Sequence, residues 1–379
     1  MVNLLRKVKR FLRDDRILKN IFKTSFQKSI LISYTVLPFF NKKETHTNNA
    51  ESRVIARIFN ALNYNVDVIH YTNQKKLDYS KYDLIFGFGE SFENSFIDKD
   101  IKRIYYATGA HVCHQNYAEI KRIEEVNIKY NSTLLPKRLV PWNWSKSTSL
   151  SDALVVIGNE WTKSTYTEYT NRDVYSINAT ALINSGVESI NRDIEKTKKS
   201  FLWFGSSGLV HKGLDLCLEF FRENKNLTLH VCGPMEDDFK KVFHDYFEEE
   251  NIIFHDFTDV KSKIFIDIVS QCSFSILPTC SEGQATSLLT TMGAGLIPIS
   301  TIYSGVDVDK YGFLIKELDM QAMNCTLLEV SQLNNEEILH KSISNLEYIN
   351  NSHNLISFEK ELTTLIVKIL NDKKQNIKR

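Results

Sequence analysis

Short apolar runs alternate with longer polar or amphipathic segments along most of the chain. In the first half these runs are SILISYTVLPF, VDVIHY, YDLIFGFG, KRIYYATGA and SDALVVIG, and the segment from about Glu51 to Leu62 spaces its apolar residues as a helix does. Buried strands that alternate with helices are typical of βαβ units and of a parallel sheet covered on both faces. We therefore predict a Rossmann-like α/β domain at residues 29–195.

A second set of apolar runs follows the charged segment NRDIEKTKKS, which we interpret as a linker. The runs are FLWFGSS, LTLHVCGP, NIIFHDF, FSILPTC and GLIPIS, with helical segments between them. The pattern predicts another Rossmann-like domain at residues 196–350, and a C-terminal helix and basic tail at residues 351–379. Two such domains would have parallel sheets that face each other across a cleft, with ligands bound outside the carboxyl ends of the strands.

Residues 1–28 differ from the rest of the chain in charge. They hold nine Lys and Arg against two Asp, a net charge of +7, and the apolar residues of segment 3–25 fall at helical spacing. A basic amphipathic helix either packs on the following domain or lies on an anionic lipid surface. Both interpretations stay open from the sequence.

The composition narrows the class of protein. The 379 residues have a net charge of +1, which gives no case for a nucleic-acid partner, and the six cysteines form no CxxC pair. Scattered cysteines in a long chain are typical of reduced thiols in the cytosol, and no apolar run approaches the roughly 18–20 residues that span a bilayer. We expect a cytoplasmic protein that residues 1–28 could bring to the inner face of the cell membrane.

Two short motifs carry little weight. GFGESF follows a predicted strand, but Phe92 stands where a dinucleotide fingerprint needs its third glycine. Asp307-Val-Asp309 has the form of a metal-binding Asp-x-Asp, although such a pair beside a glycine is more often solvated acid. We therefore expect no bound metal.

FLWFGSSGLVHKGLDL is more informative, because a strand leads into a loop of small residues and then into a helix. Gly205, Ser206 and Ser207 allow close approach to the backbone, and Lys212 adds a positive charge where the helix begins. A diphosphate is the natural ligand of such a loop. A simple turn with a surface lysine is the alternative.

Four segments, FGSSGLVHKG, LTLHVCGP, CSFSILPTCSEG and MGAGLIPIS, follow one another in the order found in a known family. From Phe201 to about Leu318 the chain resembles the nucleotide-binding domain of retaining GT-B glycosyltransferases of group one, of the bacterial surface-polysaccharide type. SDALVVIGNEWTKSTY also resembles the family's segment before the interdomain linker.

The resemblance implies roles for individual residues. Glu282 is similar to the first glutamate of the family's Glu-x7-Glu motif, which holds hydroxyls of the donor sugar, and Lys212 to the lysine that neutralises the leaving diphosphate. The residues implied in binding the donor are Gly205, Ser206, Ser207, Gly283, Thr286, Ser287, Leu288 and Thr290.

In the first domain the resemblance is less specific. Thr47, Asn48 and Asn49 match the place of the loop after the first strand, on the acceptor side. His111 and His114 follow YYATGA and are candidates for the histidine that faces the reacting sugar, with His111 preferred. For these two histidines a structural role is as well supported by the sequence as a catalytic one.

Two departures from the family pattern concern the nucleotide. Thr290 replaces the second glutamate, which binds the ribose, and Ser206 or Ser207 replaces the basic residue near the start of the phosphate loop. A neutral hydroxyl contributes less to binding than a carboxylate does. We expect altered nucleotide affinity in an unchanged fold.

The resemblance thus implies transfer of a sugar from a nucleotide diphosphate sugar to a glycan or lipid-linked acceptor, with retention. It implies no obligatory metal and no cofactor other than the nucleotide sugar as co-substrate. A sugar-nucleotide epimerase and a catalytically degenerate binding or assembly subunit remain alternatives. A nicotinamide dehydrogenase is disfavoured by Phe92.

Overall fold

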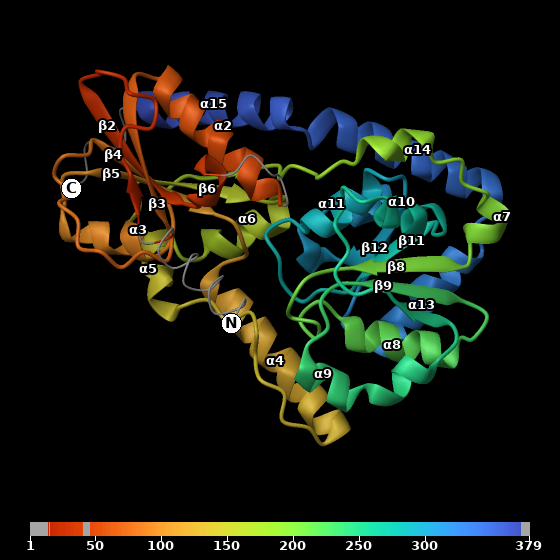
Figure 1. Ribbon diagram of the computed structural model, residues 1–379. Coiled ribbons are helices and arrows are strands. Elements are labelled where there is room, and N and C mark those ends of the chain that lie inside the picture. The colour runs from red at the N-terminus through yellow and green to blue at the C-terminus, as the bar shows by residue number, and fades with distance from the viewer. Residues whose placement is uncertain (1–13, 15, 41–45, 373–379) are drawn as a thin grey trace, which may run out of the picture.

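The computed structural model describes residues 14, 16–40 and 46–372, which form two α/β domains (Figure 1). The first contains a seven-stranded sheet in the order β1-β3-β2-β4-β5-β6-β7, parallel throughout except between β1 and β3. Its strands are β1 (Ile17–Leu18), β2 (Lys28–Tyr34), β3 (Tyr64–His70), β4 (Leu84–Gly87), β5 (Lys102–Ala107), β6 (Ala153–Ile157) and β7 (Val174–Ile177). Its helices are α2 (Thr47–Ala61), α3 (Glu90–Asn94), α4 (Val112–Tyr130), α5 (Lys146–Leu150) and α6 (Glu160–Thr167), with 3-10 turns at Leu37–Phe39, Ser95–Ile97 and Trp142–Ser145.

The second domain contains a six-stranded parallel sheet in the order β10-β9-β8-β11-β12-β13. Its strands are β8 (Ser200–Phe204), β9 (Thr228–Cys232), β10 (Ile252–Phe254), β11 (Phe274–Leu277), β12 (Ile297–Thr301) and β13 (Phe313–Ile315). The helices that follow β7 are α7 (Ile194–Thr197), α8 (Leu214–Glu223), α9 (Asp237–Val242), α10 (Lys263–Ser270), α11 (Thr286–Met292), α12 (Val308–Tyr311), α13 (Met320–Ser331), α14 (Asn335–Ser352) and α15 (Leu355–Asn371). Further 3-10 turns lie at Ser185–Ser189, His244–Glu248 and Ile302–Ser304.

The two sheets confirm the predicted pair of Rossmann-like domains. Strands β4, β6, β11 and β12 are buried along their whole length, because helices cover both faces of a parallel sheet. The edge strands β7 and β13 were not predicted. Each is short and partly exposed, so neither leaves a continuous apolar run in the sequence.

The predicted helix at residues 3–25 is wrong for the part that the structure describes. Within this segment β1 pairs antiparallel with the edge of strand β3. Asn20 and Lys23 have φ values of 40° and 55°, which a right-handed helix does not contain. Residues 1–13 and 15 lie outside the described part, so the basic half of the segment stays a prediction.

Helix α4 belongs to the first domain but extends along the second, where it ends near α9 (Figure 1). Arg122 Nη2 lies 2.6 Å from Asp215 Oδ2 on α8, and both side chains are buried. Lys137, just after α4, pairs with Asp238 of α9 at 2.6 Å. These ion pairs hold the two domains together on the side of α4.

The C-terminal helices join the domains on the opposite side. Helix α14 lies along the second domain, and α15 crosses back to lie against α2 of the first (Figure 1). Arg57 Nη2 is 3.3 Å from Glu359 Oε2, and Lys102 Nζ donates to the Ile369 carbonyl at 2.8 Å. Helix α15 is therefore part of the first domain's packing. Among the described helices none combines the length and apolarity that a membrane span requires.

The connection after β7 is bound to both domains. Ala179 N donates to Gln284 Oε1 at 2.7 Å, on the second domain. The backbone and hydroxyl of Thr180 donate to Glu51 of α2 at 3.1 and 2.7 Å. Burial raises the pKa of Glu51, although the hydrogen bonds from Thr180 oppose this. The connection is therefore anchored to the second domain at Ala179 and to the buried Glu51 of the first domain at Thr180.

Candidate functional site

Glu282 lies in the loop between β11 and α11, at the carboxyl end of the second sheet. Its carboxylate pairs with Lys212 Nζ, and its other oxygen is 3.5 Å from Arg138 Nη2 of the first domain. Burial alone would raise the pKa of Glu282, but Lys212 and Arg138 outweigh burial and lower it to about 2. Burial lowers the pKa of Lys212, and the pair with Glu282 opposes that change. One carboxylate and two cations thus meet at the edge of the sheet.

Lys212 reaches Glu282 because two turns interlock. Gly213 has a φ of +66°, and a Cβ there would lie 2.1 Å from the Pro278 carbonyl oxygen. Trp203 Nε1 also donates to the Lys212 carbonyl at 3.1 Å. Only glycine permits this backbone conformation and this approach, so the turn before α8 presents Lys212 to the loop after β11.

The loop after Glu282 touches the first domain directly. A Cβ at Gly283 would lie 2.6 Å from the Thr108 carbonyl oxygen, just beyond β5. Thr162 Oγ1 of α6 donates to the Gly283 carbonyl at 2.5 Å. The carboxyl ends of both sheets therefore meet at this loop, and the absence of a side chain at Gly283 allows the contact.

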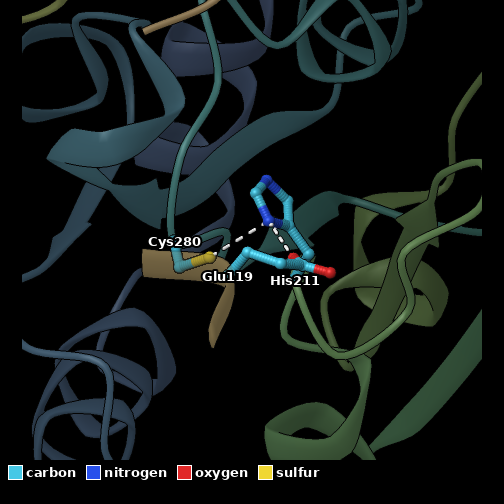
Figure 2. A group of neighbouring side chains, drawn as sticks. All are labelled: Glu119, His211 and Cys280. Atoms are coloured by element: carbon cyan, nitrogen blue, oxygen red, sulfur yellow. Dashed lines mark hydrogen bonds and ion pairs between the residues drawn. The ribbon is translucent and has the colours of Figure 1, made fainter. Parts of the chain in front are cut away.

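Next to this loop, three buried side chains from both domains lie together (Figure 2). Glu119 comes from α4, whereas His211 and Cys280 come from the two interlocked turns. His211 Nδ1 is 2.6 Å from Glu119 Oε2 and 3.2 Å from Cys280 Sγ, and Nε2 is 2.5 Å from the Ser281 carbonyl oxygen. Both ring nitrogens of His211 therefore lie within hydrogen-bond distance of an oxygen atom.

Carboxylate, imidazole and thiolate are also ligand types for transition metals. A metal bound to both His211 Nδ1 and Glu119 Oε2 would hold these atoms roughly 3 Å apart. Their separation of 2.6 Å is instead that of a charge-assisted hydrogen bond. Burial favours the neutral Glu119, but hydrogen bonds from His211 and from two backbone amides keep its pKa below the usual value. Glu119 and His211 thus form a buried hydrogen-bonded contact between the domains.

The two candidate histidines have different surroundings. His111 caps α4, accepts a hydrogen bond from Cys113 N at 3.3 Å, and stacks on Tyr169 with ring centres 3.9 Å apart. Burial and the neighbouring His114 lower the pKa of His111 to about 4, so its ring is neutral near pH 7. His114 lies closer to the second domain, as the next contacts show.

The ring of His114 is 5.3 Å from Trp161 of the first domain and 5.9 Å from Tyr303 of the second. Burial lowers the pKa of His114 as well. Of the two histidines, His114 is thus the one with ring contacts in both domains. The preference for His111 stays a prediction.

Comparison with known proteins agrees with this geometry. Residues 187–350, which form most of the second domain, match the model of the family described as glycosyl transferases group 1. The second domain is thus similar to the domain of that family. A search of curated protein sequences gave no match.

Solved structures extend the likeness to both domains. Sucrose-phosphate synthase from Thermosynechococcus elongatus aligns over 91% of this chain and 99% of its own, with a TM-score of 0.65 and 11% identity. WaaG, a glycosyltransferase involved in lipopolysaccharide biosynthesis, aligns over 89% and 99%, with a TM-score of 0.56 and 12% identity. TarM from S. aureus aligns over 76% of this chain at 13% identity and a TM-score of 0.55, and the chain spans 55% of the TarM structure. At these identities the likeness shows the fold, and that fold is GT-B.

In the second domain, the small residues of the loop after β8 have a structural explanation as well as the predicted one. A Cβ at Gly205 would lie 2.5 Å from the ring of Trp203, so packing alone requires glycine there. Ser206 and Ser207 are exposed. The amide of Gly208 donates to Glu236 Oε1 at 2.6 Å, so a protein carboxylate already holds one amide of this loop.

The start of α11 in the second domain carries four further predicted residues. Thr286 and Ser287 are partly exposed at its first turn, whereas Leu288 is buried in the core. Thr290 is buried, and its hydroxyl accepts a hydrogen bond from Leu182 N at 3.3 Å, in the connection between the domains. The structure therefore engages Thr290 with the protein backbone.

The residues predicted on the acceptor side lie at the beginning of α2. Thr47 and Asn49 are buried, and Asn48 is partly exposed. His46 caps the helix by accepting a hydrogen bond from Asn48 N at 3.3 Å. Their assignment to an acceptor stays a prediction.

The Asp-x-Asp motif lies between the domains, just after a segment that contacts the Glu282 loop, where Glu282 N donates to the Tyr303 carbonyl at 2.9 Å. Asp307 accepts a hydrogen bond from Asn159 of the first domain at 2.7 Å, whereas Asp309 is exposed on α12. Both line a cavity of about 550 Å³ that also involves Tyr348 and Glu361. The motif thus contributes to the interface, and the cavity reaches Gly158, where a Cβ would lie 2.6 Å from the Gly283 carbonyl oxygen.

Sequence reasoning predicted Glu282 and Lys212, which the structure brings together, but it did not single out Arg138 and Glu119, which lie beside them. The first two lie in a motif with a recognisable order. Arg138 and Glu119 come from the first domain, where no motif marks them, and their proximity to Glu282 results from the docking of α4. The one available signal was the uncompensated loss of a basic residue at Ser206.

Proposed function

We propose that this GT-B glycosyltransferase moves a sugar from a nucleotide diphosphate sugar to an acceptor, with the donor bound at the Glu282 loop. The observation that carries the proposal is the meeting of Glu282 with Lys212 and Arg138 at the carboxyl end of the sheet in a domain similar to that of the group 1 family. Ligands of open α/β sheets bind at this end. The TarM structure, which shares the fold, contains UDP.

The chemistry follows from the charges. Cleavage of the bond between sugar and diphosphate leaves negative charge on the departing diphosphate. A cation held in place before the reaction, such as Lys212, stabilises that charge without reorganising. Glu282 would then exchange its ion pair for hydrogen bonds to sugar hydroxyls, and the close fit of Gly283 against Thr108 would exclude water.

We further propose retention at the anomeric carbon, with the nucleotide sugar as co-substrate and no additional cofactor. The support is the order of the motifs and the two protein cations, which can supply the positive charge that a metal supplies elsewhere. Analysis of the product by NMR would give the anomeric configuration directly.

The acceptor part of the proposal rests on the charge of residues 1–28 and on the likeness to WaaG. We propose a glycan or lipid-linked acceptor in polysaccharide biosynthesis, reached at the membrane through the +7 segment of residues 1–28. WaaG, which shares the fold, takes part in lipopolysaccharide biosynthesis. Co-flotation with vesicles that contain anionic lipid, for the full chain and for a chain without residues 1–13, tests the membrane contact. Equal flotation with neutral and anionic vesicles would contradict it.

The donor proposal is tested with a panel of UDP-, GDP-, ADP- and dTDP-sugars. Each is scored for a rise in melting temperature and for slow release of the nucleoside diphosphate, with wild type, Glu282→Gln and the surface control Glu195→Gln. One donor should stabilise all three proteins, and only Glu282→Gln should lose turnover, since Glu195 is exposed and paired with Lys198. If no donor binds or reacts, with glycan acceptors present, the proposal fails.

One observation favours a binding or assembly subunit without turnover as a second candidate. The hydroxyl of Thr290 is engaged with Leu182 N, so the place of the second motif glutamate offers no carboxylate to a ribose. In that case a nucleotide sugar would bind but remain intact with every acceptor, in wild type as in Glu282→Gln.

A further inference from the structure

The phosphate loop of this chain lacks positive charge at its start. Ser206 and Ser207 are neutral and exposed, and the next amide, of Gly208, donates to the carboxylate of Glu236. A diphosphate carries about two negative charges, so such a loop alone binds it poorly. Lys212 supplies one cation from the far end of the turn.

Arg138 brings a second cation to this place from the other domain. Its side chain passes over the loop, because a Cβ at Gly208 would lie 2.5 Å from Arg138 Cγ and 2.9 Å from Cδ. Its guanidinium continues to Glu282, with Nη2 3.5 Å from Oε2. The Arg138 side chain remains 32% exposed, so a ligand can reach it.

The backbone of Arg138 is fixed by the contact between the domains. Glu119 Oε1 accepts hydrogen bonds from Lys137 N at 2.6 Å and from Arg138 N at 3.0 Å. Its other oxygen contacts His211, which precedes Lys212 in the second domain (Figure 2). Gln115 Nε2 donates to the Arg138 carbonyl at 3.0 Å. The same carboxylate therefore holds the arginine loop and the turn that carries Lys212.

We infer that Arg138 binds the diphosphate of the donor and takes the place of the basic residue missing at Ser206. A guanidinium has five N–H donors in a planar fork, so a single contact with Glu282 leaves several for phosphate oxygens. The inference rests on the proposed function. It adds that the first domain completes the donor site. The site is complete only when the two domains are docked through Glu119 and His211.

The test compares affinities for nucleoside di- and monophosphates by isothermal titration calorimetry. UDP, GDP and ADP, each beside its monophosphate, are titrated into wild type, Arg138→Gln and the control Lys121→Gln. Lys121 lies on α4 and carries the same positive charge as Arg138. Among the contacts described, it pairs only within its own helix, with Glu125 at 3.9 Å. Loss of a charged hydrogen-bond donor predicts a roughly 10- to 100-fold weaker diphosphate affinity for Arg138→Gln. The monophosphate affinity should change less, and Lys121→Gln should match wild type.

Ser206→Arg provides a second, independent variant. In the double variant Arg138→Gln/Ser206→Arg, the preference for the diphosphate should return, because a cation again lies at the start of the loop. If the double variant binds the diphosphate no better than Arg138→Gln does, the inference that Arg138 takes the place of the missing basic residue is overturned.

The outcomes separate this inference from the proposed function. If wild type binds none of the three diphosphates, the proposed donor site itself fails. If wild type binds one of them and Arg138→Gln binds it equally well, the donor site stands and the role of Arg138 is overturned. A purely structural role would lower the melting temperature of Arg138→Gln but leave the ratio of diphosphate to monophosphate affinity unchanged.

Discussion

Replacing Arg122 with methionine would leave the carboxylate of Asp215 buried without its cation. The two groups join α4 of the first domain to α8 of the second at 2.6 Å, with side-chain exposures of 7% and 5%. Methionine keeps most of the apolar length of arginine but removes the charge. The change therefore removes this ion pair, together with the contact of Arg122 Nη1 with the exposed Glu125 at 2.7 Å, and keeps most of the packing.

The expected loss of stability is large, because no cation then compensates for the desolvation of the Asp215 carboxylate. Breaking a buried ion pair by removing one partner costs about 3–5 kcal/mol. Folded proteins have a net stability of about 5–15 kcal/mol, so Arg122→Met should lose a substantial part of it. The exposed control Lys121→Met, which breaks the 3.9 Å pair with Glu125, should cost under about 1 kcal/mol.

Removing both charges should reverse most of the loss. Within the described residues, Arg122 Nε and Asp215 Oδ1 have no hydrogen-bond partner, so the pair is incompletely satisfied even in the wild type. Well-packed apolar replacements of such pairs are often neutral or stabilising. The double variant Arg122→Met/Asp215→Leu should therefore be close to wild type in stability.

The dependence on pH gives a second check. Burial raises the pKa of Asp215, and Arg122 partly offsets this, so removing Arg122 should raise that pKa further. A raised carboxyl pKa means that the folded state binds the proton more readily than the unfolded state. The deficit of Arg122→Met should thus be full above the raised pKa, and should shrink as the pH falls towards the unfolded value of about 4.

Equilibrium urea unfolding, followed by tryptophan fluorescence from pH 4 to pH 8, measures all of these values. Comparison of the slopes for each variant shows whether the two domains still unfold together. A loss below about 1 kcal/mol for Arg122→Met at pH 7 would refute the reasoning. So would a deficit that grows as the pH falls.

Three further predictions concern the donor loop and the connection. Gly283→Ala places a Cβ 2.6 Å from the Thr108 carbonyl oxygen, and this overpacking should cost about 1–3 kcal/mol of stability. The strained contact between the domains should lower kcat/KM and increase the radius of gyration; unchanged small-angle scattering would contradict this. Because the pKa of Glu282 is about 2, activity from pH 4 to pH 8 should show no acid limb due to this residue; an acid limb that vanishes in Glu282→Gln would be contrary evidence. Thr290→Val should cost about 1 kcal/mol of stability through loss of the bond to Leu182 N, with donor affinity unchanged; weaker donor binding at unchanged melting temperature would favour a ribose contact instead.

The sequence by itself determined the architecture well, for a physical reason. Strands of a parallel sheet are covered on both faces, so β6 and β12 appear as continuous apolar runs that can be recognised without a structure. The edge strand β13 has one partner and partial exposure, and its three residues carry too little pattern. The segment around β1 has helical spacing, yet pairing with the free edge of β3 decides its structure.

The candidate site likewise contains residues that the sequence could predict and residues that only the docking of the domains places there. Glu282 and Lys212 could be predicted because their motifs lie on one loop each, at the carboxyl ends of neighbouring strands. Arg138 could not, since its place depends on how α4 docks on the other domain, through contacts such as that of Glu119 with His211, 92 residues away. The sequence could show that a cation was missing from the phosphate loop. Only the tertiary structure, which brings distant segments together in a buried interface, decided that Arg138 lies over this loop and beside Glu282.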